Sequence, residues 1–264
     1  MERITKRLGF LGFGAMGSAI AEGLARFCPG TASGELRMYA YAPRADKLRE
    51  KIGTLPVTAC ASAEELAQVS DALIVAVKPY QVKDALAELK LPGKPLLSVV
   101  NAWDLAMYRD LLGEDVRVLC LMPNTPVAVG TGTVIFAREH SLTPEEYAAA
   151  KAWFSCLGAV IELPGDKMRA ASAISGCGPA FLYMVIEAMG DAGVKNGLPR
   201  ATAYELAAST MAGAGRMVLE GRGHPGELKD AVCSPGGTTI RGVAALEEAG
   251  LRSAFIRAVD AAGR

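Results

Sequence analysis

Short apolar runs alternate with amphipathic stretches through the first 163 residues of the chain. Short apolar runs bounded by turn residues are typical of buried strands, and a 3.6-residue apolar period is typical of helices. This alternation predicts a mostly parallel sheet with helices on both faces. The expected strands are 8–12, 36–41, 72–77, 95–100, 116–121, 132–137 and 158–163. The expected helices are 15–27, 44–51, 63–69, 80–89, 103–112 and 143–156.

The pattern changes after Leu163, where the strands stop and helical periodicity continues. Pro179 and Pro199 stand where the first position of a helix is expected. The boundary therefore falls near 164–166, and we predict two domains, 1–164 and 165–264. The helices expected in the second half are 166–174, 179–196, 199–220, 224–232, 239–248 and 250–262.

The helical half is rich in small residues, which permit close approach between helices. About a hundred helical residues with this much apolar surface would be poorly buried alone. We infer a dimer formed through this half; the alternative is that the helices pack on the sheet domain. The small residues are Ala201, Ala203, Ala207, Ala208, Ala212, Gly213, Ala214 and Gly215.

Composition narrows the classes of partner. The 264 residues are 51% hydrophobic, and 28 basic residues balance 28 acidic ones, which argues against nucleic acid as the main partner. Six scattered cysteines and two histidines offer no metal site of ordinary spacing. The cysteines are expected to be reduced, mostly buried thiols of a cytoplasmic protein.

No targeting or membrane segment is expected. The apolar run near the N-terminus is glycine-rich and belongs to the first strand, unlike a signal peptide. No uninterrupted apolar stretch reaches the length of a membrane span, so we expect no membrane partner.

A glycine motif follows the first strand. Gly12-x-Gly14-x-x-Gly17 lies between the apolar run 8–11 and the helical stretch 18–27. This placement is typical of the turn that binds a dinucleotide pyrophosphate at a helix N-terminus in Rossmann-like domains. The alternative is a glycine-rich turn without a ligand. The expected cofactor-binding residues here are Gly12, Phe13, Gly14, Ala15, Met16 and Gly17.

The end of the second strand bears on the choice of cofactor. An NAD-preferring strand usually ends in Asp or Glu, yet here it continues as Ala42-Pro43-Arg44, with no acid before Asp46. Arg44 suits a 2′-phosphate, which favours NADP(H), with NAD(H) still possible; alternatively Arg44 is a solvated loop residue.

Two further loops follow expected strands. Ligands of open α/β sheets bind beyond the carboxyl ends of strands. We therefore expect Ala76, Val77, Lys78 and Pro79 near the cofactor, although Lys78 could instead be a core-edge lysine with a buried stem. The loop Met122–Pro126 is either part of the site or a rigid turn that orders it.

The most polar turn of the helical half reads Cys-Ser-Pro-Gly-Gly-Thr-Thr-Ile over 233–240. Its proline and two glycines exclude a helix interior. Bare backbone amides and three hydroxyls ahead of a helix suit a small carboxylate, although an ordinary helix-helix turn is the alternative.

Taken together, these segments resemble pyrroline-5-carboxylate reductase over essentially the whole chain. The resemblance rests on segments 12–17, 76–79, 122–126, 175–180, 187–194, 197–200, 224–225 and 234–239. It departs from the family pattern at Ala63, Cys120, Arg169 and Cys177, and these departures leave the loop 234–239 intact.

The resemblance implies an α/β Rossmann-like N-terminal domain followed by an all-α C-terminal dimerisation domain. It implies hydride transfer from NAD(P)H to the C=N bond of 1-pyrroline-5-carboxylate, giving L-proline, in a dimer or a ring of dimers. It also implies that the hydroxyl of Thr239 meets the ring nitrogen as the catalytic group. The implied substrate-binding residues are Ser234, Gly236, Gly237, Thr238 and Thr239.

Two other functions stay open from the residues. One is a related imine or β-hydroxy acid oxidoreductase. A β-hydroxy acid enzyme would need a lysine general acid on the helix after the domain boundary. The only lysine in 179–196 is Lys195, near the end of that helix, which disfavours this variant. The other is a non-catalytic nucleotide-binding paralogue, against which the intact Ser234 and Thr239 argue.

Overall fold

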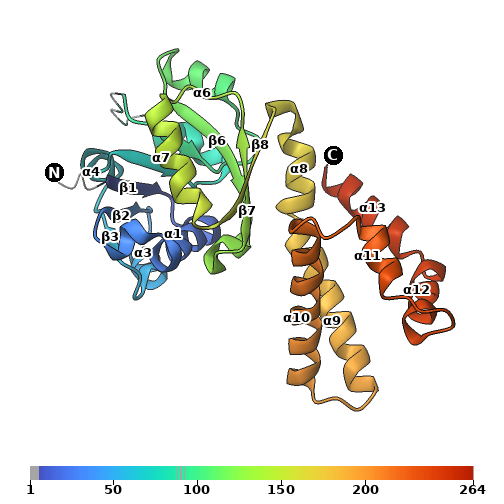
Figure 1. Cartoon of the computed structure of the whole chain (residues 1–264). Helices are drawn as coiled ribbons and strands as arrows, with labels where there is room; N and C mark the ends of the chain where they lie inside the picture. Colours follow the sequence, from blue (N-terminus) through green and yellow to red (C-terminus); the bar gives the residue numbers. More distant parts are fainter. Residues whose placement is uncertain (1–5, 88, 90, 92, 264) are drawn as a thin grey trace. The chain divides into compact units, whose positions relative to one another are not determined.

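The computed structural model describes residues 6–87, 89, 91 and 93–263. The chain divides into two compact units between Gly176 and Cys177 (Figure 1). Residues 1–5 lie outside the described residues, and the apolar run of the signal-peptide expectation belongs to strand β1, Lys6–Leu11. Position 88 of the helix expected over 80–89 also lies outside the described residues.

In the described residues, the first unit is built on an eight-stranded sheet of order β3-β2-β1-β4-β5-β6-β7-β8. Strands β1 to β6 all run parallel to one another. Strand β7 runs antiparallel to β6, and β8 runs parallel to β7. The winding of the sheet reverses between β1 and β4, where such sheets bind ligands. The strands are β1 Lys6–Leu11, β2 Leu36–Tyr41, β3 Val57–Ala59, β4 Ala72–Val75, β5 Leu96–Ser98, β6 Val118–Pro123, β7 Gly132–Ala137 and β8 Gly158–Leu163.

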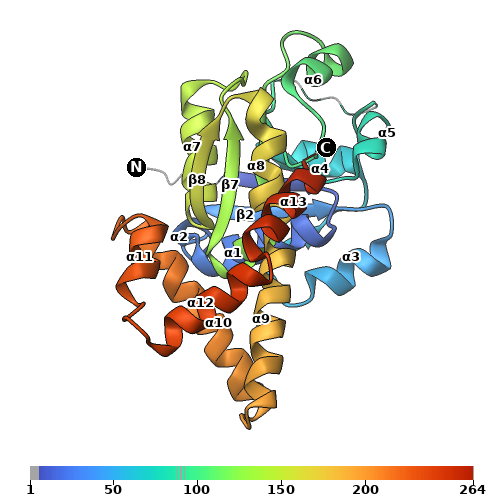
Figure 2. The same ribbon diagram turned by 90° about the vertical axis from the view of Figure 1, so that its right-hand side faces the viewer.

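Helices cover both faces of this sheet (Figures 1 and 2). Successive strand residues enter opposite cores: Ile74 belongs to one buried cluster, and its neighbours Leu73 and Val75 belong to the other. The prediction that this strand is buried on both faces is confirmed. The helices are α1 Ala15–Phe27, α2 Pro29–Ala32, α3 Ala45–Ile52, α4 Ala63–Val69, α5 Val82–Leu86, α6 Leu105–Leu112, α7 Pro144–Ser155 and α8 Met168–Ser175, with 3-10 turns η1 Pro79–Gln81, η2 Thr125–Val129 and η3 Gly165–Lys167.

The second unit is helical. Its helices are α9 Gly178–Lys195, α10 Arg200–Leu219, α11 Pro225–Ala231, α12 Thr238–Glu248 and α13 Leu251–Ala262. Helices α9 and α10 lie side by side (Figures 1 and 2). They approach closely at small residues: a Cβ on Gly193 would lie 2.8 Å from the Cβ of Ala203.

Large apolar side chains of this unit are exposed, including Met184 at 69% and Leu219 at 81%. By length and composition, the helical run Gly165–Lys195 is long and apolar enough to cross a membrane, and few of its residues are buried. The expectation concerned uninterrupted apolar stretches, and charged residues such as Lys167, Glu187 and Asp191 interrupt this run. That no membrane is a partner therefore stays a prediction.

The predicted fold class is confirmed, and every predicted strand is present with ends shifted by up to a few residues. Three short elements were not predicted, namely β3, α2 and the 3-10 turn η2. Strand β3 has three residues, of which only Val57 is buried, so it carries almost no apolar pattern. Helix α2 has four residues, none of them buried.

Candidate active site

A pocket of about 800 Å³ opens where β1, β2 and β4 end. Its lining includes Leu11, the last residue of β1, and Tyr41, the last residue of β2. The pocket belongs entirely to the first unit. Its lining is Leu11, Gly12, Phe13, Gly14, Tyr41, Ala42, Pro43, Arg44, Lys47, Leu48, Lys51, Ala63, Glu64, Ala76, Val77, Lys78, Tyr80, Gln81, Asp84, Ala85 and Leu89.

The glycine turn fits a dinucleotide phosphate. Gly12 has φ +91°, and a Cβ there would lie 2.8 Å from the carbonyl oxygen of Ala76. A Cβ on Gly17 would lie 2.8 Å from the carbonyl oxygen of Gly12, so α1 packs directly on the turn. Gly14, at the N-terminus of α1, has open space where a Cβ would project. The backbone is therefore bare at Gly12 and Gly14, which line the pocket just before the N-terminus of α1, as phosphate binding requires.

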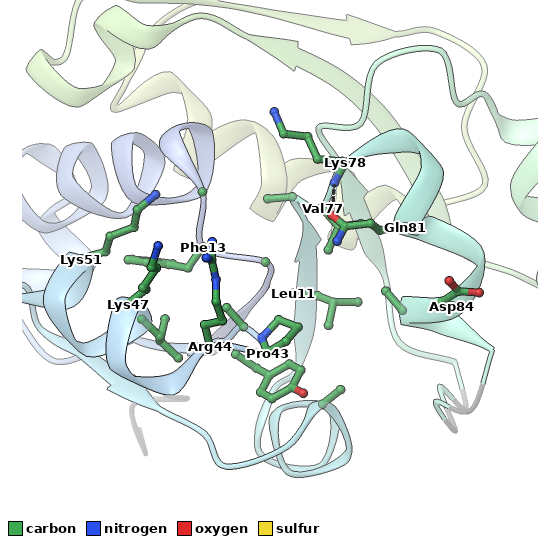
Figure 3. A pocket seen from close by; sticks show the side chains of 18 of the residues that line it. Leu11, Phe13, Pro43, Arg44, Lys47, Lys51, Val77, Lys78, Gln81 and Asp84 are labelled. Carbon is green, nitrogen blue, oxygen red and sulfur yellow. Dashed lines mark hydrogen bonds between the residues drawn. The ribbon is translucent and has the colours of Figure 1, made fainter.

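One wall of the pocket is cationic. Arg44 precedes α3, and Lys47 and Lys51 follow at intervals of three and four residues, which places them on one face of the helix. In Figure 3 these three side chains extend in a common direction beside the pocket. All three are exposed, and the described part of the chain shows no ion pair to any of them.

The opposite wall is formed by the segment that follows β4. Lys78 is exposed and lines the pocket, so its side chain is available to a ligand and its stem is not buried in the core. Gln81 closes a turn here, because its side-chain oxygen accepts the backbone N–H of Lys78 at 3.1 Å (Figure 3).

Two acids also line the pocket. The pKa of the exposed Glu64 carboxyl is lowered, chiefly by its hydrogen bond with Ser62, so this group is a carboxylate at neutral pH. The other acid, Asp84, is on α5 and lies near Gln81 (Figure 3). With Arg44, Lys47, Lys51 and Lys78 against these two acids, the lining carries net positive charge.

The structure brings most of the expected cofactor-binding residues together. Those in the lining are Gly12, Phe13, Gly14, Ala42, Pro43, Arg44, Ala76, Val77 and Lys78. Ala15, Met16, Gly17 and Pro79 do not line the pocket, although they belong to its turns. Sequence reasoning missed Lys47 and Lys51; their helical spacing from Arg44 was the signal that could have found them.

The loop Ser234–Gly237 and the first turn of α12 carry the expected substrate-binding residues. Gly236 is left-handed, with φ +67°, and the N–H of Gly237 donates to the carbonyl of Ser234 at 3.0 Å. Gly237 begins α12 without any side-chain cap, so the first amides of the helix are free to bind an anion. Both Thr238 and Thr239 are exposed in this first turn.

A neighbouring cation was missed by the sequence reasoning. The guanidinium of Arg241 donates to the carbonyl oxygen of Gly236 at 2.7 Å. Arg241 stands one turn into α12, so its charge lies beside the same uncapped amides. This addition makes the loop more favourable for a carboxylate.

Asn124 acts as a structural residue. Its side-chain oxygen accepts the N–H of Thr133 at 2.8 Å, and its amide nitrogen donates to the carbonyl of Ser175 at 3.0 Å. The side chain is 8% exposed and ties β7 to the end of α8. Of the two alternatives for this loop, the rigid ordering turn therefore applies at Asn124.

The buried thiols are unsuited to nucleophilic catalysis. Cys28, Cys60 and Cys120 are buried, and the other three are half-buried. Burial raises the pKa of Cys60 to about 11 and that of Cys120 to about 12, so both stay protonated at neutral pH. In the described residues, His, Cys, Asp and Glu side chains form no cluster of three that could hold a metal ion.

The doubly wound sheet, the glycine turn and the pocket define an oxidoreductase of the Rossmann class that uses a nicotinamide cofactor. Residues 7–102 match the family described as NADP oxidoreductase coenzyme F420-dependent, and residues 165–264 match pyrroline-5-carboxylate reductase dimerisation. The chain belongs to the pyrroline-5-carboxylate reductase family.

Full-length relatives support this assignment. The chain is 43% identical to the pyrroline-5-carboxylate reductase of Treponema pallidum, over 97% of this chain and 98% of that protein. It is 38% identical to that of Escherichia coli, over 96% and 94% respectively.

Solved structures agree. A Plasmodium falciparum pyrroline carboxylate reductase with NADP bound has TM-score 0.87 and 32% identity, covering 98% of this chain and 96% of that one. The predicted resemblance is confirmed. The family match begins at residue 165, whereas the compact units divide after 176, with α8 in the first unit. The domain boundary at 164/165 stays a prediction.

Proposed function

We propose that the protein uses NAD(P)H to reduce the C=N bond of 1-pyrroline-5-carboxylate, which gives L-proline in the last step of proline biosynthesis. One observation carries the proposal: a chain of this family combines a phosphate-ready glycine turn with an uncapped polar helix start suited to a carboxylate.

A nicotinamide cofactor held by the glycine turn 12–17 and the lining residues Arg44 and Lys78 would supply the hydride for the imine carbon. The chain's own residues position the substrate: the free amides of Thr238 and Thr239 hold its carboxylate, assisted by the charge of Arg241. The hydroxyl of Thr239 hydrogen-bonds the ring nitrogen, which ends the reaction protonated. A protonated imine is already a good electrophile, so orientation supplies much of the rate.

NADP(H) is the preferred cofactor in this proposal, with NAD(H) as a weaker alternative. The support is the cationic wall of Arg44, Lys47 and Lys51, none of which has an ion-pair partner among the described residues. A 2′-phosphate adds two negative charges that this wall can pair, whereas a ribose hydroxyl gains nothing from it.

The protein acts as a dimer or a ring of dimers in this proposal, and neither nucleic acid nor a membrane is a partner. A second copy can bury the exposed apolar side chains of α9 to α13, so no membrane is needed to bury them. A cytoplasmic location is proposed from the unpaired thiols. Cell fractionation that found the protein outside the cytoplasm would contradict it.

Turnover tests the proposed reaction. Purified protein should oxidise NADPH when 1-pyrroline-5-carboxylate is added, and Thr239→Ala should lower kcat/KM roughly ten- to a hundredfold by removing one hydrogen bond to a charged group. Thr239→Ser is the matched control and should retain most activity. Folded protein that turns over with neither nicotinamide would refute the proposal.

A further inference from the structure

A buried tryptophan in the loop after β5 contacts the turn that follows β4 beside the cofactor pocket. Trp103 follows β5 and is 9% exposed, and its indole N–H donates to the carbonyl oxygen of Pro79 at 3.1 Å. The indole packs against the Tyr108 ring at a centroid distance of 5.1 Å. Tyr108 is fully buried, with its hydroxyl 2.7 Å from Ser98 Oγ. The indole donor is therefore held by the rigid core.

The acceptor belongs to the pocket wall. Pro79 begins η1, and the residues on both sides of it, Lys78 and Tyr80, line the pocket. The same carbonyl accepts the N–H of Val82 at the end of the turn. The hydrogen bond between Gln81 and Lys78 closes the turn from within (Figure 3). The hydrogen bond from Trp103 differs from these two because it joins the turn to the loop that follows another strand, β5.

The backbone before Trp103 is strained. Ala102 has φ +62°, and among residues 6–87, 89, 91 and 93–263 no other non-glycine residue has positive φ. An L-residue in this region is strained because its Cβ crowds the backbone, and such strain persists where surrounding contacts over-determine it. The strained residue immediately precedes the indole that contacts Pro79.

We propose that Trp103 is a positioning residue that fixes the wall Val77–Gln81 in the shape that binds the nicotinamide cofactor. The inference rests on the proposed function for the identity of the ligand. Trp103 does not line the pocket itself, so it acts through the carbonyl of Pro79. Its loss should weaken cofactor binding while leaving the chemistry of the bound complex largely unchanged.

Binding of NADP+ measured by calorimetry tests the inference. Trp103→Phe keeps an aromatic ring without the donor, and Trp103→β-(3-benzothienyl)alanine keeps the bicyclic shape with sulfur in place of N–H. The second variant is made in a Trp153→Phe background, which removes the other tryptophan, on α7. Both Trp103 variants should raise Kd about fivefold, the effect of one hydrogen bond, while Trp153→Phe should not.

The kinetic pattern separates positioning from general destabilisation. KM for NADPH should rise about as much as Kd, with kcat within about twofold of the parent. A benzothienyl variant that binds NADP+ as tightly as its parent would overturn the inference, and so would a fall in kcat with KM unchanged. If the parent binds NADP+ yet fails to reduce the pyrroline, the proposed reaction fails, and the binding comparison still decides the role of Trp103.

Discussion

Single side chains set the charge of the cofactor pocket. Arg44, Lys47 and Lys51 repeat along one side of α3, and Figure 3 shows them extending together. Because they are exposed, each would contribute modestly to binding and is screened by salt, but together they would attract a doubly charged phosphate bound at this wall.

Substitution of these cations should shift cofactor preference. We expect Arg44→Ala, Lys47→Ala and Lys51→Ala each to raise KM for NADPH about three- to tenfold while leaving KM for NADH nearly unchanged. Steady-state kinetics with both cofactors measures this. Lys83→Ala is the matched control, because Lys83 is exposed on α5 outside the pocket lining. Equal losses with NADPH and NADH would show that these residues do not recognise the phosphate.

At the scale of elements, Gly14 and Gly23, two of the three glycines in α1 and its N-cap, have opposite requirements. Gly14 begins the helix in open space, and Gly23 lies in its interior against η2. A Cβ on Gly23 would lie 2.2 Å from the carbonyl oxygen of Val127, which is rigid backbone. Helix α1 therefore has open space at its N-terminus and a close backbone contact in its interior.

Alanine at these two positions should separate binding from stability. Gly23→Ala should lower the free energy of unfolding by about 1–3 kcal/mol, because the backbone of η2 must shift. Gly14→Ala should leave the unfolding free energy within about 0.5 kcal/mol and raise Kd for NADP+ at least about tenfold, because its methyl group occupies the phosphate space. Urea denaturation and calorimetry measure the two effects. A Gly14→Ala protein with normal affinity for NADP+ would show that the phosphate does not bind at this turn.

At the scale of the molecule, apolar surface points to self-association. Exposed apolar side chains recur along α9 to α13, including Tyr183, Met184, Leu219 and Ile256. Such a surface favours burial against a second copy. The reaction needs a cofactor pocket and a substrate loop at one place, and we propose that a second copy supplies one of the two.

Complementation tests a site shared between two copies. Gly14→Ala damages the pocket and Thr239→Ala damages the loop, so each homodimer should be weakly active. If sites are shared, each mixed dimer has one intact site, and random mixing should restore about a quarter of wild-type activity. Co-expression with two affinity tags isolates the mixed dimer, and light scattering gives its mass. Mixed dimers without restored activity would show that each chain builds its own site.

Sequence by itself determined the features that depend on neighbouring residues. Unbroken apolar runs marked the strands, and the glycine turn of 12–17 was recognisable because its φ and close-contact demands are local. The loop 234–239 could likewise be recognised from the sequence, because proline and paired glycines exclude a helix interior in any context.

Tertiary structure decided what long-range contacts control. Strand β3 forms because its backbone pairs with the edge of β2. The antiparallel direction of β7 is likewise defined by its pairing with β6. Lys47, Glu64 and Lys78 become lining residues of one pocket because separate strands end at the same edge of the sheet. The contact of Trp103 with Pro79 spans 24 residues, which no local pattern encodes. Local chemistry thus indicated the cofactor, while the packing of distant segments determined which side chains surround it.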